Sequence, residues 1–224
     1  MRTRSPSSGP SPRNRSSNPS NDFYNELPAQ DTRWILLSAR QEEPREGTRA
    51  INHTAPEGYT SVAPWVVTDD TGALLDFITA AFDGEELARV AVADGTIGHG
   101  EIRIGDTVVL AFDRRPGWPV VPSLLRVYVP DADAAMAAAV AHGARVVTEA
   151  DDSAWGDRGD RVRDPLGNIW WVVSRGEQVA PDQVWQRMSE PTYAEAMRTA
   201  RETLDAELSG REAGVASTPQ RPTH

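Results

Sequence analysis

The sequence predicts an α+β fold: two βαβββ units that form a curved mixed sheet around a cleft, followed by C-terminal helices. The first observation is an internal repeat, because Val62 to Phe112 aligns with Leu124 to Ser174 and places "HGEIRIGDTVVLA" over "DRVRDPLGNIWWVV". The second is that a short β-rich segment in each half precedes an acidic helix cap and an alanine-rich helical stretch. The third is that Pro181 and Pro191 each open a helical pattern after the repeat.

In the first half, Asp69 and Asp70 precede a helix that we expect over Gly72 to Phe82. Gly105 and Asp106 supply the turn of the last hairpin. The strands predicted in this half are Ala63–Val67, Ala88–Ala93, Gly100–Ile104 and Thr107–Phe112.

In the second half, Asp131 and Asp133 precede a helix over Ala134 to His142, which Gly143 ends. A second helical region follows, broken at Pro191 and continuing through Leu208. The strands predicted in this half are Leu125–Val129, Arg145–Thr148, Arg161–Arg163 and Ile169–Val173.

One such unit leaves an apolar sheet face uncovered, so two units must pair within the chain or across a dimer. We expect a homodimer. Neighbouring side chains of a strand point to opposite faces, so only one of Trp170 and Trp171 can face the cleft. The spacing of four residues from Gly167 predicts that Trp171 faces the cleft and that Trp170 lies under the helix layer.

Composition divides the chain into a central domain and polar ends. Residues 1–56 are rich in Ser, Pro, Arg and Asn and predict a disordered or loosely docked extension. The domain spans 57–178, with its two units at 57–115 and 123–174. A helical segment at 179–209 and a disordered tail at 210–224 complete the organisation.

The charge and residue usage exclude several classes of function. A net charge of −10 argues against nucleic-acid binding, which needs clustered positive charge, and favours a cationic or neutral ligand. The chain has no Cys and no Lys, which excludes disulfides, thiolate zinc sites and lysine Schiff bases. No apolar run is long enough to span a membrane, and we expect no membrane partner and a cytoplasmic protein.

Four stretches resemble the vicinal oxygen chelate superfamily, more narrowly its PhnB-like glyoxalase/bleomycin-resistance branch. They are "APWVVTDDTGALLDFITAAF", "HGEIRIGDTVVLAFD", "LLRVYVPDADAAMAAAVAHGARVV" and "WGDRGDRVRDPLGNIWWVV". The resemblance covers about residues 57–190 and implies the fold predicted above.

Metalloenzymes of that superfamily hold a divalent ion with four inward side chains, from the first and last strands of each half. When these positions are carried over to this sequence, the resemblance implies that the ligand positions are occupied by Val62 or Pro64, Val109, Leu124 or Arg126, and Trp171. None of these side chains is a suitable metal ligand, so we expect no metal cofactor. His99 and Glu101, which lie two residues apart on one strand face, are weak candidate ligands. They keep binding of a divalent metal as an alternative.

We therefore expect a cleft that binds a ligand, and we assign no catalytic residue. The leading hypothesis is a protein that sequesters a cationic or aromatic small molecule, as bleomycin-type resistance proteins do. The alternative is a glyoxalase-like metal-dependent lyase or isomerase, or a dioxygenase, with an unconventional ligand set; a partner-binding module is a third. The expected cleft residues are Trp65, Glu101, Val109, Arg126, Tyr128, Trp155 and Trp171.

Overall fold

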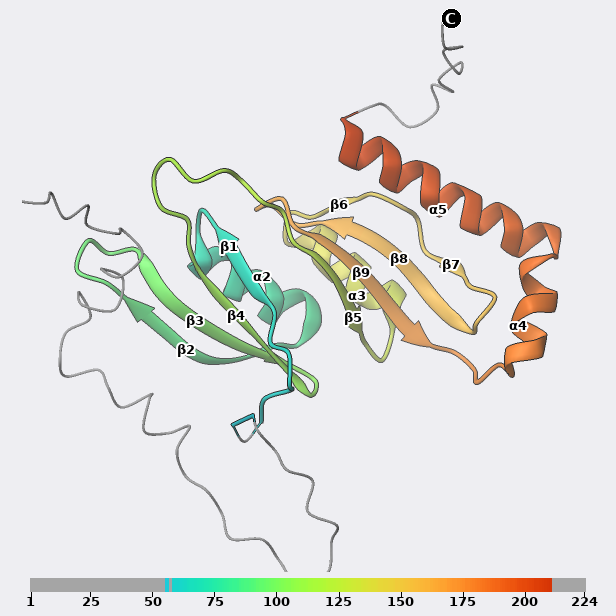
Figure 1. The fold of residues 1–224 in the computed structure, drawn as a ribbon, viewed down its shortest axis with the longest axis horizontal. Helices are drawn as coiled ribbons and strands as arrows, with labels where there is room; N and C mark the ends of the chain where they lie inside the picture. Colours follow the sequence, from blue (N-terminus) through green and yellow to red (C-terminus); the bar gives the residue numbers. More distant parts are fainter. Residues whose placement is uncertain (1–54, 57, 211–224) are drawn as a thin grey trace, which may run out of the picture. The chain divides into compact units, whose positions relative to one another are not determined.

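The protein forms two mixed β-sheets, each with a helix against one face (Figure 1). The computed structural model describes residues 55–56 and 58–210. The expected disorder of 1–56 and 210–224 therefore falls almost entirely outside the described residues. Among those described, no helix is long and apolar enough to cross a membrane.

The first unit has the strand order β1-β4-β3-β2, and we call it sheet A. β1 is parallel to β4, and the other neighbours are antiparallel. Its elements are β1 (Trp65–Thr68), α2 (Thr71–Phe82), β2 (Glu85–Ala91), β3 (Ile97–Ile104) and β4 (Thr107–Asp113).

The second unit repeats this topology, with the order β5-β9-β8-β6 and a short strand β7 on β8; we call it sheet B. The C-terminal helices follow it. The elements are β5 (Leu124–Tyr128), α3 (Ala132–Ala141), β6 (Arg145–Val146), β7 (Asp151–Asp152), β8 (Asp157–Arg163), β9 (Ile169–Arg175), α4 (Pro181–Met188) and α5 (Pro191–Ser209).

The predicted helix caps are present in both halves. The Asp70 carboxylate accepts a hydrogen bond from the Ala73 backbone N–H at 2.8 Å, and Asp131 does the same for Ala134 at 3.0 Å. Each cap satisfies one N–H that the helix itself leaves without a partner.

β8 is the strand that sequence patterning locates least well, because it begins four residues before the predicted Arg161. Its first half, "DRGD", is charged and lacks the alternation typical of a strand. Ion pairs stabilise it instead: Arg158 binds Asp133, and Asp157 binds Arg126.

The two units share one core, which lies between the helix-bearing faces of the sheets. α2 packs against α3, and the Phe82 ring lies 4.9 Å from the Trp170 ring, measured between centroids. The prediction of two βαβββ units is confirmed. The sheets remain separate rather than forming one curved sheet around a common cleft, because the units pair through their helices.

The Asp164 carboxylate organises the turn before β9. Its Oδ1 accepts from the Leu166 and Asn168 backbone N–H groups, at 2.9 and 2.8 Å. Its Oδ2 accepts from the Asn168 side-chain amide and from Trp170 Nε1, each at 2.9 Å. Because Asp164 is 3 % exposed, these four hydrogen bonds are almost fully shielded from water.

We predict that Asp164→Ala lowers the free energy of unfolding by about 3 kcal/mol or more, because a buried donor without a partner costs ~1–3 kcal/mol. Urea unfolding followed by tryptophan fluorescence measures this change. Asp106→Ala, in the exposed turn of the matching hairpin, is the control and should be close to wild type. Equal stability of the two variants would contradict the role assigned to Asp164.

Candidate functional site

Three side chains form a row across sheet B, on the face opposite α3. Arg126 of β5 is the register partner of Trp171 on β9, and Trp171 is the partner of Arg161 on β8. Both guanidinium carbons lie 4.4 Å from the Trp171 ring centroid. This arrangement is a double cation–π contact, in which each cation contributes about 0.5–2 kcal/mol.

Asp157 holds the Arg126 end of this row. Its Oδ2 accepts from Arg126 Nη2 at 2.5 Å and from Trp155 Nε1 at 3.0 Å. Arg175 Nε lies 2.8 Å from Oδ1 of the same carboxylate. Because Asp157 is buried, the shared carboxylate fixes both the Arg126 side chain and the Trp155 indole.

Arg161 connects the other end of the row to the C-terminal helix. Its Nη1 donates to the Ala200 carbonyl of α5 at 3.0 Å and lies 2.9 Å from Asp160 Oδ1. Burial lowers the pKa of Arg161. Burial also raises the pKa of Asp160 to about 6, although the Arg161 cation opposes this change.

α5 covers part of this sheet face and forms a pocket with it. Glu207 accepts two hydrogen bonds from Arg145 Nη2, at 2.7 and 2.8 Å, and lies 2.5 Å from Arg163 Nε. The Thr203 hydroxyl lies 2.6 Å from that of Thr148. These contacts attach the C-terminal part of α5 to sheet B, beside β6 and β7 (Figure 1).

The pocket has a volume of about 500 Å³ and lies between sheet B, the β7 segment and the two C-terminal helices. Arg126, Arg161, Trp155 and Trp171 line it on the sheet side. The side chains that helices α4 and α5 contribute are Met188, Ala194, Ala196, Met197, Ala200 and Arg201.

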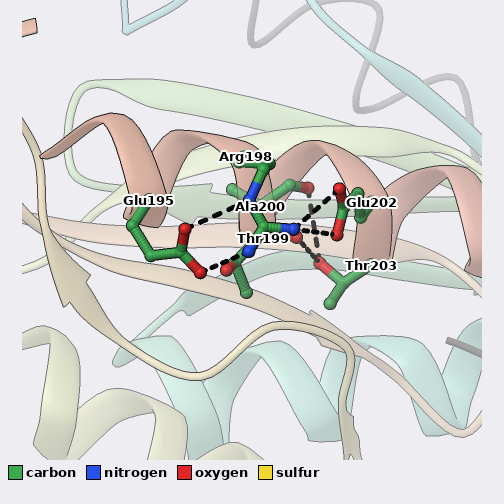
Figure 2. Close-up of polar contacts among 6 residues, drawn as sticks. All are labelled: Glu195, Arg198, Thr199, Ala200, Glu202 and Thr203. Atoms are coloured by element: carbon green, nitrogen blue, oxygen red, sulfur yellow. Dashed lines mark hydrogen bonds and ion pairs between the residues drawn. The ribbon is translucent and has the colours of Figure 1, made fainter. Parts of the chain in front are cut away.

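The outer surface of α5 has a different character. Arg198 forms ion pairs with Glu195 and Glu202, three positions before it and four after it, as Figure 2 shows. None of these three residues lines the pocket. The helix therefore presents methionine, alanine and Arg201 to the pocket and paired charges to solvent.

Trp65, Glu101 and Val109, three of the other expected cleft residues, lie on sheet A. Glu101 accepts a hydrogen bond from Tyr59 Oη at 2.6 Å, and its second oxygen lies 2.6 Å from His99 Nε2. The His99 bond lowers the pKa of Glu101, whereas burial and the Glu101 bond raise the pKa of Tyr59. Trp65 contacts His99 edge-on, with 5.8 Å between ring centroids.

The predicted cleft residues therefore fall into two groups. Arg126, Trp155 and Trp171 line the pocket, and Tyr128 is exposed with its ring 5.0 Å from the Arg126 guanidinium carbon. Trp65 and Glu101 lie on sheet A instead, because the units pair through their helices.

Val109 requires a correction, because it is 4 % exposed and packs in the core with α2. The sequence matches Val109 to Trp171 because each lies four residues after its turn glycine. The match is wrong by one residue, because the turn at Gly105 is shorter than the turn at Gly167. A shift of one residue moves a side chain to the opposite face of a strand. Leu110, the register partner of both Trp65 and Glu101, holds the position that matches Trp171.

The expected positions on the first strand of each unit also need correction. Val62 and Pro64 both precede β1, which begins at Trp65. In the second half, Leu124 and Arg126 both belong to β5. Because Trp65 pairs with Leu110 as Arg126 pairs with Trp171, these four residues occupy equivalent places in the two units.

The side chains at these four equivalent positions do not fit a divalent metal centre. Trp65, Leu110, Arg126 and Trp171 offer no suitable ligand atom. Within residues 55–56 and 58–210, no group of three His, Asp or Glu side chains is arranged to hold an ion. His99 and Glu101 do lie together, and they bind each other.

The contribution of α5 is the part of the pocket that sequence reasoning misses. Ala194, Met197 and Ala200 recur at a three-residue spacing and line one side of the helix. Such a short, weakly apolar stripe is a signal for burial but does not identify the sheet that it faces.

Asp160 should make stability depend on pH. Because its pKa is raised, the native state retains a proton that the unfolded chain releases, so stability is lost as pH rises from about 4 through 6. We predict that Asp160→Asn removes this loss. The difference in unfolding free energy between variant and wild type should change by about 2 kcal/mol between pH 4 and pH 7, measured by urea unfolding. A difference that stays constant across this range would contradict the assignment.

Comparisons with known proteins place the chain in a family and identify similar proteins. The family model described as Glyoxalase/Bleomycin resistance protein/Dioxygenase superfamily matches residues 50–172. An uncharacterised protein of Mycobacterium bovis, Mb0911c, is 34% identical over 140 residues, which cover 58% of this chain and 92% of that protein. A Mycobacterium tuberculosis H37Rv protein, Rv0887c, has the same identity over 82% of its length.

Solved structures are similar over about half of the chain. TioX from Micromonospora sp. ML1 is 25% identical with a TM-score of 0.43, over 54% of this chain and 98% of TioX. A glyoxalase/bleomycin resistance protein from Albidiferax ferrireducens T118 is 18% identical with a TM-score of 0.42, over 50% and 96% of the two chains. A PhnB protein from Bacillus cereus is 11% identical with a TM-score of 0.39, over 51% and 99%.

The family match rests on the repeated βαβββ region, which is the part of the chain that carries the sheet faces described above. It confirms the resemblance noted in the sequence. The chain belongs to the Glyoxalase/Bleomycin resistance protein/Dioxygenase superfamily.

Proposed function

We propose that this protein binds an aromatic small molecule, without a metal ion, in the pocket between sheet B and α5. One observation carries the proposal: Arg126, Trp171 and Arg161 form a fixed row in a cavity that a helix covers. We infer a cytoplasmic role, in which the protein sequesters its ligand.

The size and lining of the pocket support a ligand with a flat apolar body. Its volume of about 500 Å³ falls within the usual range for small-molecule sites. Trp155, Val173, Met188 and Met197 supply apolar surface, and methionine side chains adapt readily to different ligand shapes.

Of the two ligand classes expected from the sequence, the pocket favours the aromatic class over the cationic class. A cationic ligand would need an open face of Trp171, but two guanidinium groups already lie against that ring. The net charge of the whole chain, which suggests a cationic ligand, does not describe this local arrangement.

Binding fits the lining better than catalysis does. Ser153 accepts a hydrogen bond from the Asp157 N–H, and no histidine of the described part of the chain lines the pocket to activate a nucleophile. Asp157 already binds two arginines, Arg126 and Arg175, so its carboxylate is engaged within the protein rather than directed at a substrate. The glyoxalase-like alternative would rest on His99 and Glu101, which lie on sheet A.

Filling the pocket should abolish binding. N-phenyl-1-naphthylamine, a neutral aromatic compound that fluoresces in apolar surroundings, is the probe, measured by fluorescence titration. We predict that Ala200→Trp weakens its affinity at least about tenfold, because the indole would occupy the cavity. Thr199→Trp, at the neighbouring exposed position, is the matched control and should bind within about twofold of wild type. Wild-type affinity in Ala200→Trp would sink the proposal.

We also propose a homodimer, formed through exposed apolar side chains on sheet A and the segment that follows it. Trp118 contacts Phe112, which contacts Trp65, with centroid distances of 6.1 and 5.4 Å. Val120 and Val121, next in the chain, are also exposed. Exposed apolar groups gathered in this way are typical of protein interfaces.

We predict that Val120→Asp combined with Val121→Asp shifts a dimer toward monomer, because the new carboxylates would lose water on association. Sedimentation velocity at tens of micromolar protein measures the change. Leu208→Asp, an equally exposed leucine on α5, should leave the wild-type distribution intact. A wild-type protein that sediments as a monomer would contradict the proposed dimer.

A further inference from the structure

Among the described residues, three arginines line the pocket, and each comes from a different element. Arg126 belongs to β5, Arg161 to β8 and Arg201 to α5. Most of the remaining lining is apolar, so the guanidinium groups are the polar groups most able to select a ligand there.

We propose that the ligand carries an oxyanion attached to its aromatic body, and that the guanidinium groups of Arg126, Arg161 and Arg201 bind that anion. This inference rests on the proposed function and names the chemical class of the ligand. A guanidinium group offers several N–H donors in one plane and matches the geometry of a carboxylate or sulfonate.

Arg161 is the strongest evidence, because its side chain is only 7 % exposed. It donates one hydrogen bond to the Ala200 carbonyl. Asp160 Oδ1 lies 2.9 Å from Nη1 but accepts no hydrogen bond with suitable geometry. None of the Arg161 nitrogens is a fully buried atom without a partner, and Arg161 lines the pocket, where its remaining donors can serve a ligand.

Arg126 and Arg201 add donors from two other directions. Arg126 gives Nη2 to Asp157, and about a third of its side chain stays exposed. The side chain of Arg201, an exposed residue, forms no ion pair or hydrogen bond with another residue in the described part of the chain. An unpaired arginine on the covering helix can reach a bound anion at no cost to an existing contact.

The carboxylates of the pocket are less available to a cationic ligand. Asp157 is held by Arg126 and Arg175, and Asp152 pairs with Arg158 at 3.2 Å. Asp160 is buried beside Arg161. Asp151 is exposed to water on β7 and needs no ligand to compensate its charge.

A pair of matched probes tests the proposal. Anilinonaphthalene sulfonate carries an anionic group on nearly the same aromatic body as neutral N-phenyl-1-naphthylamine. We expect wild-type protein to bind the sulfonate at least about tenfold more tightly, and rising salt to weaken only the sulfonate. Arg201→Gln should lower sulfonate affinity about fivefold or more and lower neutral-probe affinity by clearly less, because only the sulfonate carries a charge for the guanidinium to bind.

Arg198→Gln is the matched control, because Arg198 lies on the same helix and pairs with Glu195 and Glu202 (Figure 2), and none of the three lines the pocket. It should change neither affinity. Equal affinities of wild type for the two probes, or an equal loss of both in Arg201→Gln, would overturn the oxyanion proposal.

The filled-pocket variant separates this test from that of the proposed function. If Ala200→Trp abolishes neutral-probe binding but Arg201→Gln has no selective effect, the oxyanion proposal fails and the proposed function stands. If both probes bind Ala200→Trp as they bind wild type, the proposed function fails. Competition identifies the anion: 1-naphthoate should displace the sulfonate, whereas displacement by inorganic phosphate alone would contradict an aromatic ligand.

Discussion

The structure depends on the register of β9, which the buried Asp164 carboxylate fixes. Four hydrogen bonds to this carboxylate hold the turn, and one of them binds the Trp170 indole. With Trp170 fixed in the core against Phe82 of the other unit, strand alternation places Trp171 on the opposite face. A register shift of one residue would exchange the two indoles and remove both the shared core and the row of cations.

α5 gives the two equivalent sheet faces different roles. On sheet B, Glu207 binds Arg145 and Arg163 and attaches a helix that covers Trp171. On sheet A, Trp65 remains half exposed. Because the two βαβββ units are so similar, the difference between a covered pocket and an open face arises outside the repeat.

Much of the fold could be predicted from the sequence, because its signals are local. The helix caps at Asp70 and Asp131 and the opposite facing of Trp170 and Trp171 follow from side-chain chemistry and strand alternation. Val109 could not be placed correctly, since the length of a hairpin turn decides which face its strand presents. The division of the expected cleft residues between two faces could not be predicted either, because it depends on how the units pack.

The central claim is that ligands bind at Trp171 on sheet B rather than at Trp65 on sheet A. The most direct measurement is a two-dimensional NMR spectrum of protein labelled with ¹⁵N in the tryptophan indoles, titrated with N-phenyl-1-naphthylamine and assigned by single Trp→Phe variants. We expect the Trp171 and Trp155 signals to shift and those of Trp65, Trp118 and Trp170 to stay in place. Shifts at Trp65 and Trp118, with Trp171 unchanged, would contradict it.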